Sequence, residues 1–234
     1  MKIRKGLMMM VVLMIMVALV VPAWAQAPAQ SMQNLEVLAQ VGLQMETNMK
    51  ALRGYTFQQR TAVQINGELK NVKLVQVAFT PQGETLVTTL SSEPPEQLHG
   101  GPLMRHIEED KVKELQGEIE QVVALSSSYL MLDQQGLQQL GRMAQAWVSP
   151  DGNSIRVVAS GFQQPGDQVT IICDGATKRQ LQTQVTTTVF GGPMTINAQY
   201  QQWPSGLNYN AQTLINVPGK GMQITINTMN YIKQ

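Results

Sequence analysis

The sequence contains little cysteine, histidine, aromatic residue or charge, and each scarcity excludes a class of protein. One cysteine among 234 residues excludes a disulfide within the chain. Two histidines are too few to supply the usual ligands of a metal centre. Charged residues make up 14% of the chain, with a formal net charge of +1. A chain so nearly neutral lacks the basic surface by which proteins bind nucleic acid.

The first 25 residues have the three-part layout of a secretory signal peptide. Residues 7–21 form an apolar run of about 15 residues, shorter than the roughly 20 that span a bilayer. Small residues at Ala23 and Ala25 then predict cleavage before Gln26. No cysteine lies near this point, so we expect no lipid attachment and no stable membrane anchor after cleavage. The expected location is the periplasm or the medium. The basic residues that precede the apolar run are Lys2, Arg4 and Lys5.

The segment after the signal is expected to form one domain. Three of the 17 Lys and Arg residues and none of the 16 Asp and Glu residues precede Gln26, so the remainder carries a net charge of −2. We expect residues 26–30, rich in Ala, Pro and Gln, to form a flexible tail, and residues 31–234 to enclose a single core. Cys173 is expected to be a small buried strand residue.

Apolar residues at three- and four-residue spacings predict three helices. The first is expected to start at Ser31, run to Leu52 and end at Gly54, and the second to cover 103–129. Asp133 can cap a third helix, whose apolar stripe would extend as far as Trp147.

Alternating apolar and polar residues, separated by turn signals such as Asn66-Gly67, predict about nine strands. Since the helices do not alternate with the strands, an α+β fold is favoured over a parallel α/β sheet. A twisted sheet of this size tends to curl. We therefore expect a curved antiparallel half-barrel with the three helices against its concave face. The expected strands cover 55–65, 69–79, 84–90, 154–162, 168–174, 179–190, 194–202, 207–217 and 222–232.

The order of these elements resembles that of the LolA-like periplasmic lipoprotein carriers and their outer-membrane lipoprotein-sorting relatives. The most local feature of the resemblance is the strand–turn–strand segment Val169-Thr-Ile-Ile-Cys-Asp-Gly-Ala-Thr-Lys-Arg-Gln-Leu181. Leu207-Asn-Tyr-Asn-Ala-Gln-Thr213 is similar to a further repeat of that pattern, and residues 55–231 also resemble secreted bacterial proteins of similar size. The resemblance implies a half-barrel whose apolar cavity holds acyl chains. The functional arginine of the carriers is not matched to any arginine of this sequence.

No motif predicts catalysis, a metal site or a cofactor. His99 and His106 lack the further ligands that a metal site needs in a defined arrangement. The three serines at 126–128 lack the base and orienting partner that a serine nucleophile needs. We interpret the carboxylates of 108–110 as a solvated helical face, and the glycine pairs at 100–101 and 191–192 as turns. The chain is not expected to be an enzyme.

Apolar and aromatic side chains remain as candidates for a binding site. They either line a cavity between sheet and helices or fill an ordinary core. In the first case the partner is a lipid, an acyl group or a lipidated protein. In the second case the chain is a structural or interaction module that binds an envelope protein through strands such as 180–188. The candidate cavity residues are Tyr55, Phe57, Val75, Val77, Phe79 and Trp147.

Overall fold

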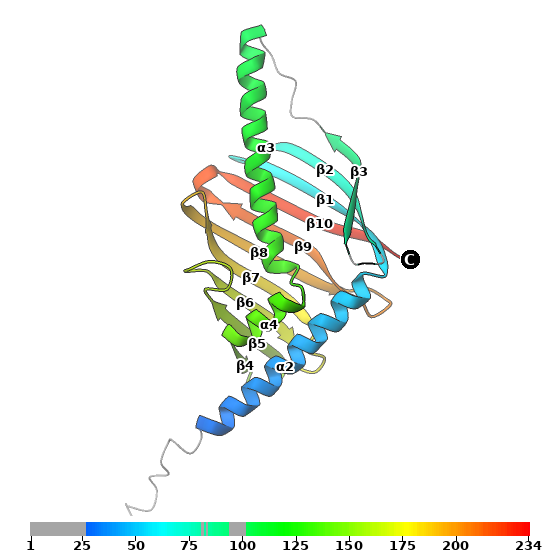
Figure 1. Ribbon diagram of the computed structural model, residues 1–234, viewed down its shortest axis with the longest axis vertical. Helices are drawn as coiled ribbons and strands as arrows, with labels where there is room; N and C mark the ends of the chain where they lie inside the picture. Colours follow the sequence, from blue (N-terminus) through cyan, green and yellow to red (C-terminus); the bar gives the residue numbers. More distant parts are fainter. Residues whose placement is uncertain (1–26, 81, 83, 94–101) are drawn as a thin grey trace, which may run out of the picture. The chain divides into compact units, whose positions relative to one another are not determined.

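The computed structural model describes residues 27–80, 82, 84–93 and 102–234 and divides the chain into two compact units, Met1–Val37 and Leu38–Gln234. The expected signal peptide at 1–25 and His99 lie outside the described residues. The described part of the first unit is the beginning of a helix that continues into the second unit, and the sheet, its other helices and the candidate site all belong to the second unit (Figure 1).

Ten antiparallel strands form one open, curved sheet in the order β3-β2-β1-β10-β9-β8-β7-β6-β5-β4. Strands β4 to β10 pair in chain order, and so do strands β1 to β3. These two series join where β1 pairs with β10. The α+β fold with a curved antiparallel sheet is therefore confirmed. The strands are β1 (Tyr55–Ile65), β2 (Glu68–Phe79), β3 (Thr85–Glu93), β4 (Ala144–Val148), β5 (Ser154–Ser160), β6 (Gln168–Asp174), β7 (Gln180–Val189), β8 (Gly192–Gln202), β9 (Asn208–Val217) and β10 (Met222–Lys233).

Short turns connect most of these strands, and the first hairpin shows why the turn residues are needed. Asn66 and Gly67 have φ angles of 52° and 83°, the left-handed values that a two-residue hairpin turn requires. The 3-10 helix η2 (Pro218–Lys220) turns the chain between β9 and β10. There the Asn66 amide N–H donates to the Gly221 carbonyl at 2.8 Å, which links two neighbouring turns.

The three helices are α2 (Ala27–Leu52), α3 (Pro102–Leu130) and α4 (Gln134–Met143). Within the second unit, α3, α4 and residues 38–52 of α2 lie on the same face of the sheet (Figure 1). Val122, Ser126 and Tyr129 form the buried stripe near the end of α3, at the helical spacing. The side chain of Asp133 caps α4 by accepting from the Gly136 amide at 2.7 Å, as the sequence predicts.

Two helix boundaries differ from expectation. Helix α2 begins at Ala27 instead of Ser31, so 27–30 are helical; Pro28 in the first turn is compatible with a helix because the first amides lack intrahelical acceptors. Helix α4 ends at Met143, and the next five residues form the edge strand β4. Trp147 is consequently 48% exposed on that strand, opposite Arg156 of β5. Trp and Val are compatible with a strand, and the pairing with β5 decides against the helical spacing.

The core of the large sheet is aliphatic, in keeping with the small number of aromatic residues. Alternate residues of β5 to β10 point to the covered face and are almost fully buried. Cys173 is among them, as predicted. The largest of these side chains are Ile155, Ile171, Met194, Ile196, Ile215 and Ile224.

Two bulges change which residues face inward at the β9–β10 end of the sheet. Gln199 pairs with Gln212 and Tyr200 with Asn210, so Ala211 has no partner on β8. Beyond this bulge, Asn208 and Asn210 take inward positions, because one extra residue reverses the alternation.

The second bulge lies in β10. Thr56 pairs with Ile232 and Gln58 with Met229, which leaves two β10 residues opposite Phe57. The first of them, Asn230, has a φ angle of 57°, a value that Asn adopts more readily than most residues. The second, Tyr231, is buried, and its ring stacks on Phe57 with the centroids 4.8 Å apart.

Candidate functional site

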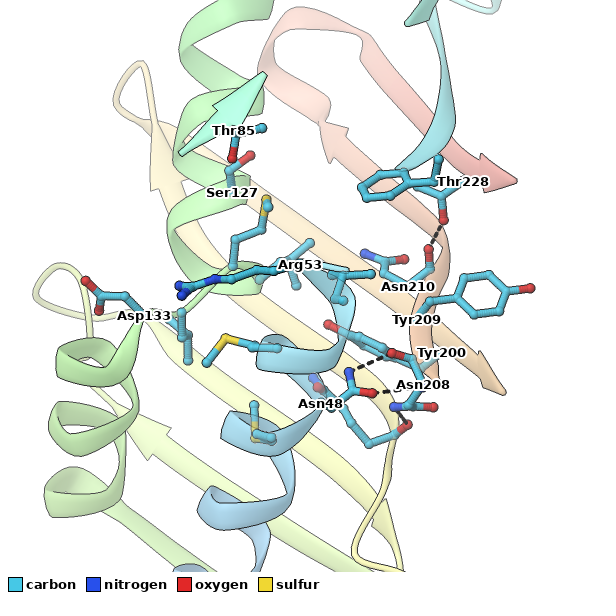
Figure 2. Close-up of a pocket in the computed structure, with 18 of the residues that line it drawn as sticks. Asn48, Arg53, Thr85, Ser127, Asp133, Tyr200, Asn208, Tyr209, Asn210 and Thr228 are labelled. Carbon is cyan, nitrogen blue, oxygen red and sulfur yellow. Dashed lines mark hydrogen bonds between the residues drawn. The ribbon is translucent and has the colours of Figure 1, made fainter. Parts of the chain in front are cut away.

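A cavity of about 590 Å³ lies between the inner face of the sheet, the last turns of α2 and the junction of α3 with α4 (Figure 2). This volume falls within the range of about 300–1,000 Å³ that small-molecule sites occupy. The sheet side of the cavity is built by residues of β1, β2, β3, β7, β8, β9 and β10. The cavity therefore lies where the two bulges alter the alternation of the strands.

The helical wall of the cavity is mainly apolar and flexible. Met45, Met49 and Leu52 contribute from α2, and Met131 and Leu132 from the connection to α4. Methionine has an unbranched, polarizable side chain that adapts to the shape of an apolar partner. A wall with three methionines suits ligands whose chains vary in length or conformation.

An aromatic cluster forms the opposite wall, with Tyr231 at its centre. The Tyr231 ring lies 4.8 Å from Phe57, 4.6 Å from Tyr209 and 5.7 Å from Trp203, measured between ring centroids. Burial raises the pKa of Tyr231 to about 12, so its hydroxyl stays neutral. Although aromatic residues make up 5% of the sequence, five of them line this cavity: Phe57, Phe79, Tyr200, Tyr209 and Tyr231. Tyr55 and Trp203 pack in the cluster behind them.

The sheet opens at the cavity, and side chains replace the missing strand contacts. The pairing of β9 with β10 ends at Gln212 and Asn227. Further along β9, the Asn48 amide of α2 donates to the Asn208 carbonyl at 2.6 Å and accepts from the Asn208 N–H at 2.8 Å. The hydroxyl of Thr228 donates to the Asn210 carbonyl. Asn48 thus takes the place of a strand partner and fixes α2 to the sheet.

Two polar side-chain atoms in the cavity lining are buried without a hydrogen-bond partner among the described residues: the Tyr200 hydroxyl and Asn210 Oδ1. Thr183 and Gln180 lie beside the Tyr200 hydroxyl, but their side chains bond to each other, and neither meets it in hydrogen-bond geometry. Burial raises the pKa of Tyr200 to about 12. Asn210 Nδ2 donates to Thr213 Oγ1 at 2.7 Å, which leaves its oxygen free.

Of the six residues predicted to line a cavity, the structure places two in the lining, Phe57 and Phe79. Tyr55, Val75 and Val77 are buried with Phe57 in the cluster behind it. Trp147 lies on the exposed face of β4, so its assignment to the cavity is wrong. The predicted set also missed the polar part of the lining, because the strand alternation alone turns Asn208 and Asn210 outward.

A second buried polar centre lies at Asp167 and serves the architecture. Its carboxylate accepts from the Tyr129 hydroxyl at 2.7 Å and from the amides of Phe162, Gln163 and Gln164 at 2.6, 2.8 and 3.1 Å. Burial raises the pKa of Asp167, but these hydrogen bonds outweigh it and the net pKa is lowered. The carboxylate stays charged and closes the loop between β5 and β6 onto α3.

The nucleophilic side chains are held in structural roles. Burial raises the pKa of the Cys173 thiol to about 12, which suppresses the reactive thiolate. The Ser126 hydroxyl donates to the Val122 carbonyl at 2.8 Å within the helix α3. Within the described residues, no three His, Cys, Asp or Glu side chains are placed to hold a metal ion. The side chains of His106 and 108–110 lie outside the described part.

Comparison with known proteins gives a structural similarity but no matching family. In the described part of the chain, no helix combines the length and apolarity needed to cross a membrane. The sequence matches no protein-family model and no curated protein. Among solved structures, the chain is similar to a crystal structure of a DUF1329 family protein from Desulfovibrio piger, with 8% identity and a TM-score of 0.43 over 82% of this chain and 92% of that one.

Proposed function

We propose that this protein is an exported, non-catalytic protein of the cell envelope that binds an acyl chain or a similar apolar ligand in the cavity between sheet and helices. The observation that carries the proposal is the cavity of about 590 Å³ with its wall of methionines and aromatic rings. Small-molecule sites are concave and mainly apolar clefts of about this volume, so a partly open cavity of this size and lining suits a ligand. The resemblance to lipoprotein carriers agrees with this use.

Binding is tested by displacement of N-phenylnaphthylamine, a dye that fluoresces in apolar sites, with fatty alcohols of increasing length. Each added methylene should raise affinity about fourfold, because its burial contributes roughly 0.8 kcal/mol, until the cavity is full. Mass spectrometry of gently purified protein would then identify the natural ligand. Affinity that does not change with chain length would contradict an apolar cavity site.

A bulky substitution in the lining tests the location. Ala124 of α3 lines the cavity, and Ala124→Trp should lower dye affinity at least tenfold by occupying its space. Gln121→Trp is the matched control, because Gln121 is exposed on the same helix outside the lining and its replacement should leave binding unchanged. If the wild-type protein binds neither dye nor fatty alcohol, the alternative is a structural module that contacts an envelope protein through its Gln- and Thr-rich strands.

Export is tested separately from binding. The full chain, produced in a Gram-negative host, should appear in the periplasm with a mass that corresponds to cleavage before Gln26. A full-length, membrane-bound product would contradict cleavage and would leave the binding proposal to be judged on the dye experiments.

A further inference from the structure

The cavity runs across the strands as a narrow channel at one end of the sheet. Its lining takes residues from neighbouring strands in the order β3-β2-β1-β10-β9-β8-β7, from Thr85 of β3 to Gln180 of β7. In Figure 2, Thr85 and Asn208 lie toward opposite ends of the lining residues. Adjacent strands lie about 4.8 Å apart, so the path from β3 to β7 is at most about 29 Å long.

The width of this channel follows from its volume. A cavity of about 590 Å³ spread over about 29 Å has a mean cross-section of about 20 Å², and of about 30 Å² if the curvature of the sheet shortens the path to about 20 Å. A methylene is similar in size to a water molecule, which occupies about 30 Å³ in the liquid, and an extended chain advances about 1.2 Å per bond. One alkyl chain therefore has a cross-section of about 25 Å², whereas two chains side by side need about 50 Å².

Hydrogen bonds hold the helical wall at a fixed distance from the sheet. The Asn48 side chain of α2 exchanges two hydrogen bonds with the backbone of Asn208 on β9, at 2.6 and 2.8 Å. The Tyr129 hydroxyl of α3 donates to Asp167 at 2.7 Å. A second chain would enter only if one of these contacts broke. The methionines of the wall can change rotamer and follow a bend in one chain, but their volume stays in the channel.

We infer that the cavity takes one alkyl chain at a time, so that its ligand is a single-chain amphiphile such as a fatty acid, a fatty alcohol or a lysolipid. This inference rests on the proposed function, because it names the class of ligand for the same cavity. At about 30 Å³ per methylene, the channel holds at most about 20 carbons. A phospholipid or a lipidated protein with two long chains leaves one of them in water.

Two lipids with the same head group and the same number of acyl carbons test the width of the channel. Lauroyl lysophosphatidylcholine carries these carbons in one chain, and dihexanoyl phosphatidylcholine divides them between two. Both displace N-phenylnaphthylamine below the concentration at which they form micelles. Half of the methylenes of the two-chain lipid stay outside the channel, so it should bind at least a hundredfold more weakly. Native mass spectrometry should show one lysolipid per protein.

A series of lysophosphatidylcholines with about 10 to 24 acyl carbons tests the capacity, because affinity should stop rising at or below about 20 carbons. Met49→Ala removes three heavy atoms from the lining and should extend this limit by about three carbons. Met143→Ala is the matched control, since Met143 is exposed on α4 outside the lining. Ser127→Leu adds two heavy atoms to the lining and should shorten the limit by about two carbons, which carries the test even if Met49→Ala fails to fold.

The outcomes separate this inference from the proposed function. Equal affinities for the two lipids of matched carbon number, or affinity that rises through the whole series, would overturn the single-chain inference and leave the apolar site intact. A limit that neither lining variant shifts would also overturn it, because the limit would not then be set by the cavity. Failure of every probe, the dye included, would instead refute the proposed function.

Discussion

Two buried tyrosines with similarly raised pKa values should respond in opposite ways to loss of the hydroxyl. Burial raises the pKa of both Tyr129 and Tyr200 to about 12. The Tyr129 hydroxyl donates to Asp167 at 2.7 Å and lies 3.0 Å from Thr187 Oγ1, whereas the Tyr200 hydroxyl has no described partner. The pKa reports burial in both cases, and the hydrogen bonds decide what the hydroxyl contributes to stability.

The magnitudes follow from these contacts. A hydrogen bond to a charged group contributes about 1.5–3 kcal/mol, so Tyr129→Phe should lower the free energy of unfolding by about 2 kcal/mol. Burying an unpaired hydroxyl costs about 1–3 kcal/mol, so Tyr200→Phe should raise it by about 1 kcal/mol in the ligand-free protein.

Urea denaturation followed by far-ultraviolet circular dichroism measures both variants, and equal slopes against urea would show that the unfolding reaction is unchanged. The midpoint should rise for Tyr200→Phe and fall for Tyr129→Phe. A Tyr200→Phe protein destabilised as strongly as Tyr129→Phe would refute the reasoning, because its hydroxyl would then have a partner within the protein.

Three further predictions concern other contacts. Asn48→Ala should lower the free energy of unfolding in urea by about 1–3 kcal/mol, because it leaves a backbone donor and acceptor of β9 unpaired, whereas the exposed neighbour Thr47→Ala should change it little. Because the pKa of Asp167 is lowered in the folded protein, its carboxylate adds to the free energy of unfolding above the unfolded pKa of about 3.9, and this contribution is lost as pH falls through the folded pKa. Asp167→Asn should therefore make the free energy of unfolding fall less steeply at acid pH, as measured by urea titrations at several pH values. Cys173 should react with a thiol reagent only after denaturation, and rapid labelling of the native protein would contradict its burial.

Much of the sheet is predictable from the sequence because alternation and turn chemistry are local signals. Asn66-Gly67 marks a hairpin whose strands match the expected ranges within a residue or two. The pairing of β1 with β10 is not predictable in this way, since it depends on two segments far apart along the chain. Strand β4 was missed because its residues also continue the helical stripe of α4, and only pairing with β5 decides between them.

The candidate site was only partly predictable, and the bulges explain why. Phe57 and Phe79 follow the simple alternation of β1 and β2, so the sequence identifies them as inward residues. Asn210 faces inward because Ala211 is an extra residue in β9, and Tyr231 because β10 gains a residue at Asn230. A one-residue shift reverses every later side chain, and the sequence carries no strong local signal for either shift.

The junction of β1 with β10 also has a consequence for how the protein folds. Strands β4 to β10 can pair in order through short turns, and β1 to β3 can do the same, whereas the contact between Thr56 and Ile232 spans 176 residues. Pairing between segments so far apart along the chain is intrinsically slow, so we expect this joining step to be the slow one. Because the aromatic cluster draws Phe57 from one series and Tyr231 from the other, the cavity forms only when the two halves meet. Dye binding during refolding would therefore time the completion of the sheet.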